Sequence, residues 1–152
     1  MMFTKLNLPP YSFRTKQDQD KIFIFDEIRK KFLMLTPEEW VRQNFIHFLI
    51  REKGFPPQLM VIEGGLKINQ NKFRADLLVY DRFGHPLLVV EFKAPAVKIT
   101  QGVFDQIARY NMKFQVAWLI VSNGLSHYCC QIDHQEKTYS FLKDIPAFDQ
   151  LG

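Results

Sequence analysis

The sequence predicts an α/β domain, and three observations support this prediction. Stretches 36–53 and 100–113 each begin with a threonine where a helix N-cap is expected. Between them lie three stretches rich in β-branched and large apolar residues, as is typical of strands: 59–68, 75–80 and 87–92. Residues 116–121 are wholly apolar, which favours a strand covered on both faces. The expected core order is therefore helix, three-stranded meander, helix, strand.

The composition indicates one soluble domain. A chain of 152 residues with 47% apolar content and 15 Phe can build a substantial core. Its apolar runs fall far short of the roughly 20 residues that cross a bilayer, and the N-terminus lacks the apolar segment of a secretory signal. We therefore expect a cytoplasmic protein without membrane contact. The net charge of +4 is compatible with a polyanionic partner but does not identify one.

The N-terminal elements come first in the chain. Residues 1–20 are polar and contain prolines, so they are interpreted as an arm laid on a domain that spans 21–152. Apolar stretches on either side of the charged patch 26–31 predict an N-terminal hairpin within 21–35. The first helix follows, because Thr36 is a natural N-cap, Pro37 suits the first helical position and Glu39 completes a Thr-x-x-Glu capping box.

The remaining elements are bounded by turn and cap residues. Gly54 and the prolines after it separate the first helix from the meander, and Thr100 caps the second helix. Residues 127–132 and 138–142, joined by the polar turn 133–137, predict a C-terminal hairpin.

The register of the central hairpin can be predicted from its turn. The loop 82–85 contains the only glycine between the second and third strands, so we place the turn centre between residues 83 and 84. Antiparallel pairing then brings together residues whose numbers add up to 167, which sets Asp76 opposite Glu91. Since side chains alternate along a strand, Lys93 shares the face of Glu91, while Phe92 points into the core.

This pattern of charges predicts a metal site. Two carboxylates directly opposite on paired strands repel each other, and strands disfavour Asp, so the arrangement is costly without a cation. Mg²⁺ or Mn²⁺ suits two carboxylates, Asp76 and Glu91, with the Phe92 carbonyl as a further oxygen ligand. In phosphodiester hydrolysis, Lys93 would orient or deprotonate the attacking water and offset the growing negative charge.

Several motifs resemble those of one nuclease superfamily. Asp76, fourteen intervening residues and then Glu91-Phe92-Lys93 resemble the D…ExK signature of PD-(D/E)xK nucleases. Gln106 and Tyr110 form a Q-x-x-x-Y on the second helix, similar to a motif of RecB-like nucleases and of the N-terminal nuclease domain of type I restriction (R) subunits. The segments L-T-P-E-E-W-V-R-Q, R-A-D, V-E-F-K-A-P and S-N-G extend the resemblance over roughly residues 23–128.

The resemblance implies a restriction-endonuclease-like core and a metal-dependent endonuclease that hydrolyses DNA. It places Gln106 and Tyr110 beside the metal site, where they help to hold DNA or order the catalytic groups. The alternative is an exposed polar pair flanking buried residues. Many relatives carry an acidic residue on the first helix that points to the metal. Glu39 is the nearest match, although the capping box also accounts for it, and Glu63 is a weaker candidate.

The resemblance also bears on partners. A complete restriction subunit carries an ATP-driven translocase and works with specificity and modification subunits, whereas this chain has no Walker A glycine loop. The chain is therefore interpreted either as a nuclease domain of such a system or as a free-standing relative. The alternative function is a catalytically idle nucleic-acid-binding or scaffolding module with the nuclease fold.

Overall fold

The computed structural model describes residues 3–68 and 71–152, and its N-terminal part is a three-stranded antiparallel sheet. Strand β2 (Lys21–Asp26) pairs with β3 (Lys31–Met34), which confirms the expected hairpin. Strand β1 (Thr15–Asp18) adds a third strand that the interpretation of 1–20 as an arm had missed. All four β1 residues are exposed and polar or charged, so no apolar alternation marked the strand. The division into an arm and a domain at residue 21 stays a prediction.

The first helix has the expected start, but its cap is only half of the predicted box. Helix α1 (Pro37–Lys53) begins after Thr36, whose Oγ1 accepts a hydrogen bond from the Glu39 N–H at 3.0 Å. The Glu39 carboxylate does not return to the cap; it accepts hydrogen bonds from Arg42 and Gln43 instead. Gly54 ends the helix in the left-handed conformation, with φ of 70°.

The main sheet has six strands in the order β11-β10-β9-β8-β7-β4. Its strands are β4 (Met60–Ile62), β7 (Leu77–Tyr80), β8 (Pro86–Phe92), β9 (Trp118–Ser122), β10 (His127–Asp133) and β11 (Thr138–Leu142). Only β8 and β9 run parallel, and helix α2 (Gln101–Asn111) lies in the crossover between them. The predicted meander (β4, β7, β8), the strand at 116–121 and the C-terminal hairpin (β10, β11) are thereby confirmed. Short 3₁₀ turns occupy Pro57–Leu59, Met112–Phe114 and Phe148–Gln150.

The first strand of the meander is shorter than predicted. The stretch 59–68 is interrupted after Ile62, where Glu63 takes a positive φ of 55°. The chain then forms a separate hairpin of β5 (Gly65–Ile68) and β6 (Asn71–Arg74) before it rejoins the sheet at β7. A continuous run of strand-forming residues does not reveal such a change of sheet, because β propensity does not specify the pairing partner.

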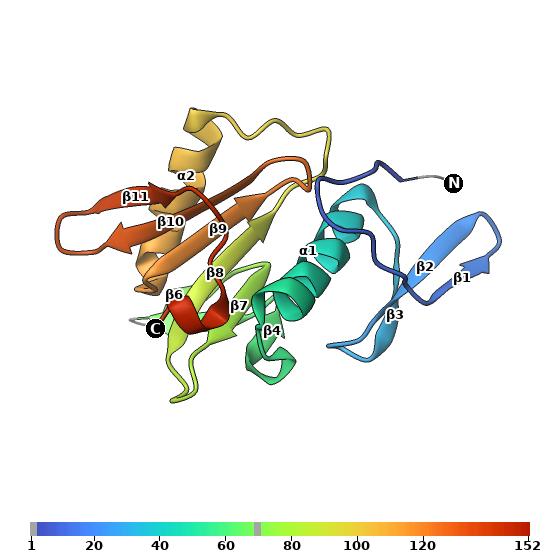
Figure 1. Cartoon of the computed structure of the whole chain (residues 1–152), viewed down its shortest axis with the longest axis horizontal. Coiled ribbons are helices and arrows are strands. Elements are labelled where there is room, and N and C mark those ends of the chain that lie inside the picture. Colours follow the sequence, from blue (N-terminus) through green and yellow to red (C-terminus); the bar gives the residue numbers. More distant parts are fainter. Residues whose placement is uncertain (1–2, 69–70) are drawn as a thin grey trace.

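The two helices cover opposite faces of the main sheet. Val41, Phe45 and Leu49 of α1 pack in one buried cluster with alternate residues of β7, β8 and β9. Phe104 and Ala108 of α2 belong to a second cluster on the other face. Figure 1 shows α1 between the main sheet and the β1–β3 sheet, which extends at the periphery. In the part of the chain that the structure describes, neither helix is long and apolar enough to cross a membrane.

Candidate active site

The hairpin β7–β8 has the predicted register. The observed pairs are Leu77 with Val90, Leu78 with Val89, and Val79 with Leu88. A bulge beyond Val79 shifts the pairing only near the turn. Asp76, which directly precedes β7, therefore lies beside Glu91 near the end of β8. Its Oδ2 accepts a hydrogen bond from the Phe92 N–H at 2.8 Å, which fixes the carboxylate against β8.

Glu91 lies in an environment that opposes its ionisation. Burial, the charge of Asp76 and a hydrogen bond with Asp76, in that order of size, together raise its pKa to about 8. A hydrogen bond from the Asn111 side chain works in the opposite direction. At neutral pH the Asp76–Glu91 pair therefore retains a proton, which a divalent cation could replace.

Asn111 was not identified from the sequence. Its side chain is 1% exposed, and its Nδ2 donates a hydrogen bond to the Ile107 carbonyl at 2.8 Å. Among the described residues, its Oδ1 finds no hydrogen-bond partner. A single Asn at a helix end gives no sequence signal for this role, because only the packing of α2 on the sheet brings it to Glu91.

Lys93 directly follows β8 and lies two residues after Glu91 in the chain. Its backbone N–H donates to the Ser122 carbonyl at 2.9 Å, which extends the β8–β9 pairing by one step. Its side chain is half-buried, and its charge lowers the pKa of Glu38. The predicted trio of Asp76, Glu91 and Lys93 thus gathers at one end of the β7–β8 hairpin.

Glu38 is the acidic residue of the first helix whose pKa is affected by the charges of this site. Its pKa is raised first by burial and then by the charge of Asp76, and it is lowered by Arg42 and Lys93. Its side chain remains 49% exposed. Glu39, the residue selected from the sequence, is instead 8% exposed and binds the Arg42 Nη1 at 2.8 Å and the Gln43 Nε2 at 2.9 Å. Sequence alone did not distinguish the two neighbours, because their orientation depends on how α1 packs.

Arg42 links these acids and was also missed. Its Nη2 lies 3.7 Å from Asp76 Oδ1 and 3.9 Å from Glu38 Oε1, while its Nη1 holds Glu39. The residue is only 6% exposed, so these contacts are poorly screened by solvent. Arg42 is four residues after Glu38, and this i, i+4 spacing was the available signal. Its guanidinium can hold Glu38 and Asp76 together against their mutual repulsion.

Glu63 contacts the same cluster of acidic and basic side chains. Its carboxylate lies 4.0 Å from Arg42 Nη1, 3.8 Å from Arg29 Nη1 and 3.6 Å from Arg74 Nη2. Arg29 also contacts Glu39 at 3.6 Å and forms an ion pair with buried Asp26 at 2.8 Å. The cluster therefore connects the β2–β3 turn to the residues that flank Asp76.

Gln106 and Tyr110 are both exposed on α2, as the polar-pair alternative also expects. Tyr110 packs edge-on against Phe73 and Phe114, and its hydroxyl accepts a hydrogen bond from the Arg74 N–H at 3.4 Å. Since Arg74 is two residues before Asp76, Tyr110 lies at the border of the site. Gln106 makes no side-chain hydrogen bond with the described residues, so the structure does not join it to the carboxylates.

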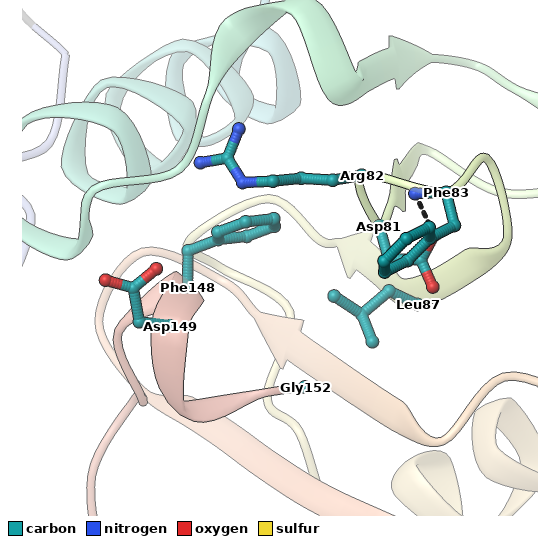
Figure 2. Close-up of a pocket in the computed structure, with 7 residues that line it drawn as sticks. All are labelled: Asp81, Arg82, Phe83, Leu87, Phe148, Asp149 and Gly152. Atoms are coloured by element: carbon teal, nitrogen blue, oxygen red, sulfur yellow. Dashed lines mark hydrogen bonds between the residues drawn. The ribbon is translucent and has the colours of Figure 1, made fainter.

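A cavity of about 190 Å³ lies away from this site, at the turn end of the β7–β8 hairpin. Figure 2 shows Arg82 extended above the ring of Phe148, with Phe83 and Leu87 beside the hollow. Asp76 and Glu91 are at the other end of the same two strands. Across residues 3–68 and 71–152, no group of three or more His, Cys, Asp or Glu residues is arranged to hold a metal ion. Protein ligands beyond the Asp76–Glu91 pair would require main-chain oxygens or movement of Glu38.

Comparison with known proteins gives matches of two kinds. The family model for the type I restriction enzyme R protein N terminus matches residues 37–146. A fragment structure of a putative HsdR subunit of a type I restriction enzyme from Vibrio vulnificus YJ016 is similar with a TM-score of 0.55 and 20% identity. The match covers 77% of this chain and 24% of that one, and at this identity it shows the fold alone. The search of curated proteins gave no match.

Proposed function

This chain belongs to the family of type I restriction enzyme R protein N-terminal domains, and we propose that it is a metal-dependent endonuclease domain that hydrolyses DNA phosphodiester bonds. The observation that supports this most strongly is the side-by-side placement of Asp76 and Glu91, with Lys93 next along the chain. We also propose that α1, β4, β7, β8, α2 and β9 form a PD-(D/E)xK, restriction-endonuclease-like core. Residues 21–152 would make up this domain, with 1–20 attached to it.

The donor set fits Mg²⁺ or Mn²⁺, which prefer oxygen ligands and keep several waters. Asp76 and Glu91 would hold the ion with the Phe92 carbonyl. The hydrogen bond to Oδ2 fixes the Asp76 carboxylate, whose Oδ1 lies 3.7 Å from Arg42 Nη2 and would bind the ion, and Glu91 would give up its proton. Bound there, the cation would polarise the phosphoryl oxygen, lower the pKa of a bound water and stabilise the leaving oxygen.

Other side chains of the domain would orient the water, position the metal ligands and hold the DNA. Lys93 orients the attacking water and offsets negative charge that develops on the phosphate. Arg42 holds Asp76 and Glu38 in place, and Asn111 aligns Glu91. Tyr110, at the border of the site, helps to hold the DNA together with Gln106.

The wider context follows from the family and stays part of the proposal. The chain covers 24% of the similar HsdR fragment, so translocation, target recognition and modification would belong to other parts or subunits of a cytoplasmic restriction system. No element within residues 3–68 and 71–152 resembles a major-groove recognition helix, which favours cleavage with little sequence preference.

The direct test is cleavage of plasmid and single-stranded DNA with Mg²⁺, Mn²⁺ or EDTA. Wild type should nick or linearise plasmid only with a metal, whereas Asp76→Asn and Lys93→Ala should lose nearly all activity. Lys98→Ala, which removes an exposed lysine close in sequence, is the matched control and should cleave as wild type does. Equal cleavage by wild type and Lys93→Ala would contradict the assignment. An inactive wild type that still binds DNA would favour the idle-module alternative.

A further inference from the structure

The β1–β3 sheet has two unlike faces. Ile24 and Asp26 of β2 are buried, and Asp26 accepts a hydrogen bond from Gln43 of α1 at 3.0 Å, so this face packs on the helix. The register places a different set of side chains together on the opposite, outward face: Arg14, Lys16, Phe23, Phe25, Phe32 and Met34. These six residues are called the cation–aromatic face below.

Two cations are held over the rings of this face. The Arg14 Cζ lies 4.7 Å from the centroid of the Phe25 ring and 5.3 Å from that of Phe32. The Lys16 Nζ lies 4.5 Å from the Phe32 centroid and 5.9 Å from that of Phe23. Such contacts attract a cation to a ring without neutralising its charge. Neither Arg14 nor Lys16 forms an ion pair with any carboxylate that the structure describes.

The face is open and faces outward. Arg14 and Lys16 are exposed, and Met34 is 48% exposed. In Figure 1 the β1–β3 sheet lies at the edge of the molecule, with α1 separating it from the main sheet. Asp18 and Lys21 offset each other at the far end of the β1–β2 hairpin, so the excess positive charge lies at Arg14 and Lys16.

The same small sheet contacts the candidate site through its β2–β3 turn. One pair, Asp26 with Lys31, separates Phe25 and Phe32 from the β2–β3 turn, which carries Arg29. Arg29 lies 3.6 Å from Glu39 and 3.8 Å from Glu63, within the cluster that surrounds Arg42.

We propose that the cation–aromatic face binds the phosphate backbone of DNA outside the cleavage site. Unneutralised, positioned cations fit a polyanion, and phosphate contacts supply affinity without reading sequence. The rings are already covered by Arg14 and Lys16, so they fix these cations rather than stack on bases. The choice of DNA rests on the proposed function. The family match begins at residue 37 and assigns nothing to this sheet.

The test measures DNA binding by the full chain in EDTA, so it does not depend on cleavage. Arg14→Gln/Lys16→Gln should weaken binding of a fluorescent duplex at least about fivefold. It should also reduce the slope of log K against log salt by about 1 to 2, because each phosphate contact contributes roughly 0.9. The control Lys137→Gln/Lys143→Gln removes the same charge from exposed residues in and after the C-terminal hairpin.

The two double variants separate local contact from net charge. Weaker DNA binding by Arg14→Gln/Lys16→Gln alone supports the proposal. Equally weakened binding by both variants, or unchanged binding by both, overturns it. With Mg²⁺ and saturating protein, the control Lys137→Gln/Lys143→Gln should cleave plasmid at the wild-type rate. A wild type that binds DNA through this face without cleaving it would contradict the nuclease proposal alone.

Discussion

Replacing Glu91 with glutamine should change how the free energy of unfolding depends on pH. In the metal-free folded protein, burial and the neighbouring Asp76 raise the Glu91 pKa from 4.5 to about 8. Between these values the folded state keeps a proton that the unfolded state loses. The protonated Glu91 carboxyl group therefore makes its full contribution to the free energy of unfolding below pH 4.5. This contribution is lost as pH rises through 8. The free energy of unfolding should therefore fall by roughly 1 kcal/mol per pH unit, or roughly 2 kcal/mol between about pH 5.5 and 7.5.

Titrating groups that do not contact Glu91 act in both proteins and cancel in the comparison. Burial lowers the pKa values of His47 and His127, so unfolding takes up protons there and stability rises with pH up to about 6.5. The difference between wild type and Glu91→Gln isolates the carboxyl group. Urea unfolding in EDTA at about pH 5.5, 6.5 and 7.5, followed by the fluorescence of Trp40 and Trp118, measures it.

As pH rises across this range, the free energy of unfolding of Glu91→Gln should increase by about 2 kcal/mol relative to that of wild type, because the amide that replaces the carboxyl group cannot ionise. Saturating Mn²⁺ should stabilise wild type, more strongly at higher pH, since the metal replaces the Glu91 proton. It should have little effect on Glu91→Gln. Parallel pH profiles of the two proteins in EDTA would refute the placement of a half-buried Glu91 carboxyl group beside Asp76.

The remaining predictions concern the other side chains of the site. Lys93→Ala should retain DNA and metal binding within a few-fold but lose roughly 10²–10³ in single-turnover cleavage rate, and a defect that more protein restores would indicate a binding role instead. Glu38→Gln should raise the Mn²⁺ concentration needed for half-maximal cleavage with little change in urea midpoint. Glu39→Gln should instead lose roughly 2 kcal/mol of stability, because it weakens a buried ion pair; the reverse pattern would return Glu39 to the metal site. Tyr110→Phe and Gln106→Ala should slow cleavage without lowering the melting temperature, and a large loss of melting temperature with normal cleavage would support a packing role.

Several features of the fold were predictable because short segments encode them. Thr36 and Pro37 define the start of α1, and a cap depends only on neighbouring backbone groups. The glycine in the 82–85 loop located the turn closely enough to set the register of Leu77 with Val90. Alternation along the strands then placed Asp76, Glu91 and Lys93 together. The wholly apolar run at 116–121 indicated a strand between two layers, as β9 is.

Features that depend on distant partners were not predictable. β1 has no apolar pattern, because it is stabilised by pairing with β2 at the edge of a small sheet. The stretch 59–68 looks continuous, yet Glu63 turns the chain into a second hairpin. Each outcome depends on which segment supplies the hydrogen-bond partners, and that choice does not appear in the local sequence.

The sequence by itself determined which residues carry the candidate chemistry, since Asp76, Glu91 and Lys93 are brought together by one hairpin and its two-residue alternation. Only the tertiary structure decided what surrounds them. Arg42 comes from α1 and Asn111 from α2, and each reaches the carboxylates because its helix packs on one face of the sheet. Such contacts join segments tens of residues apart, so their geometry arises from the packing of whole layers and from no local pattern.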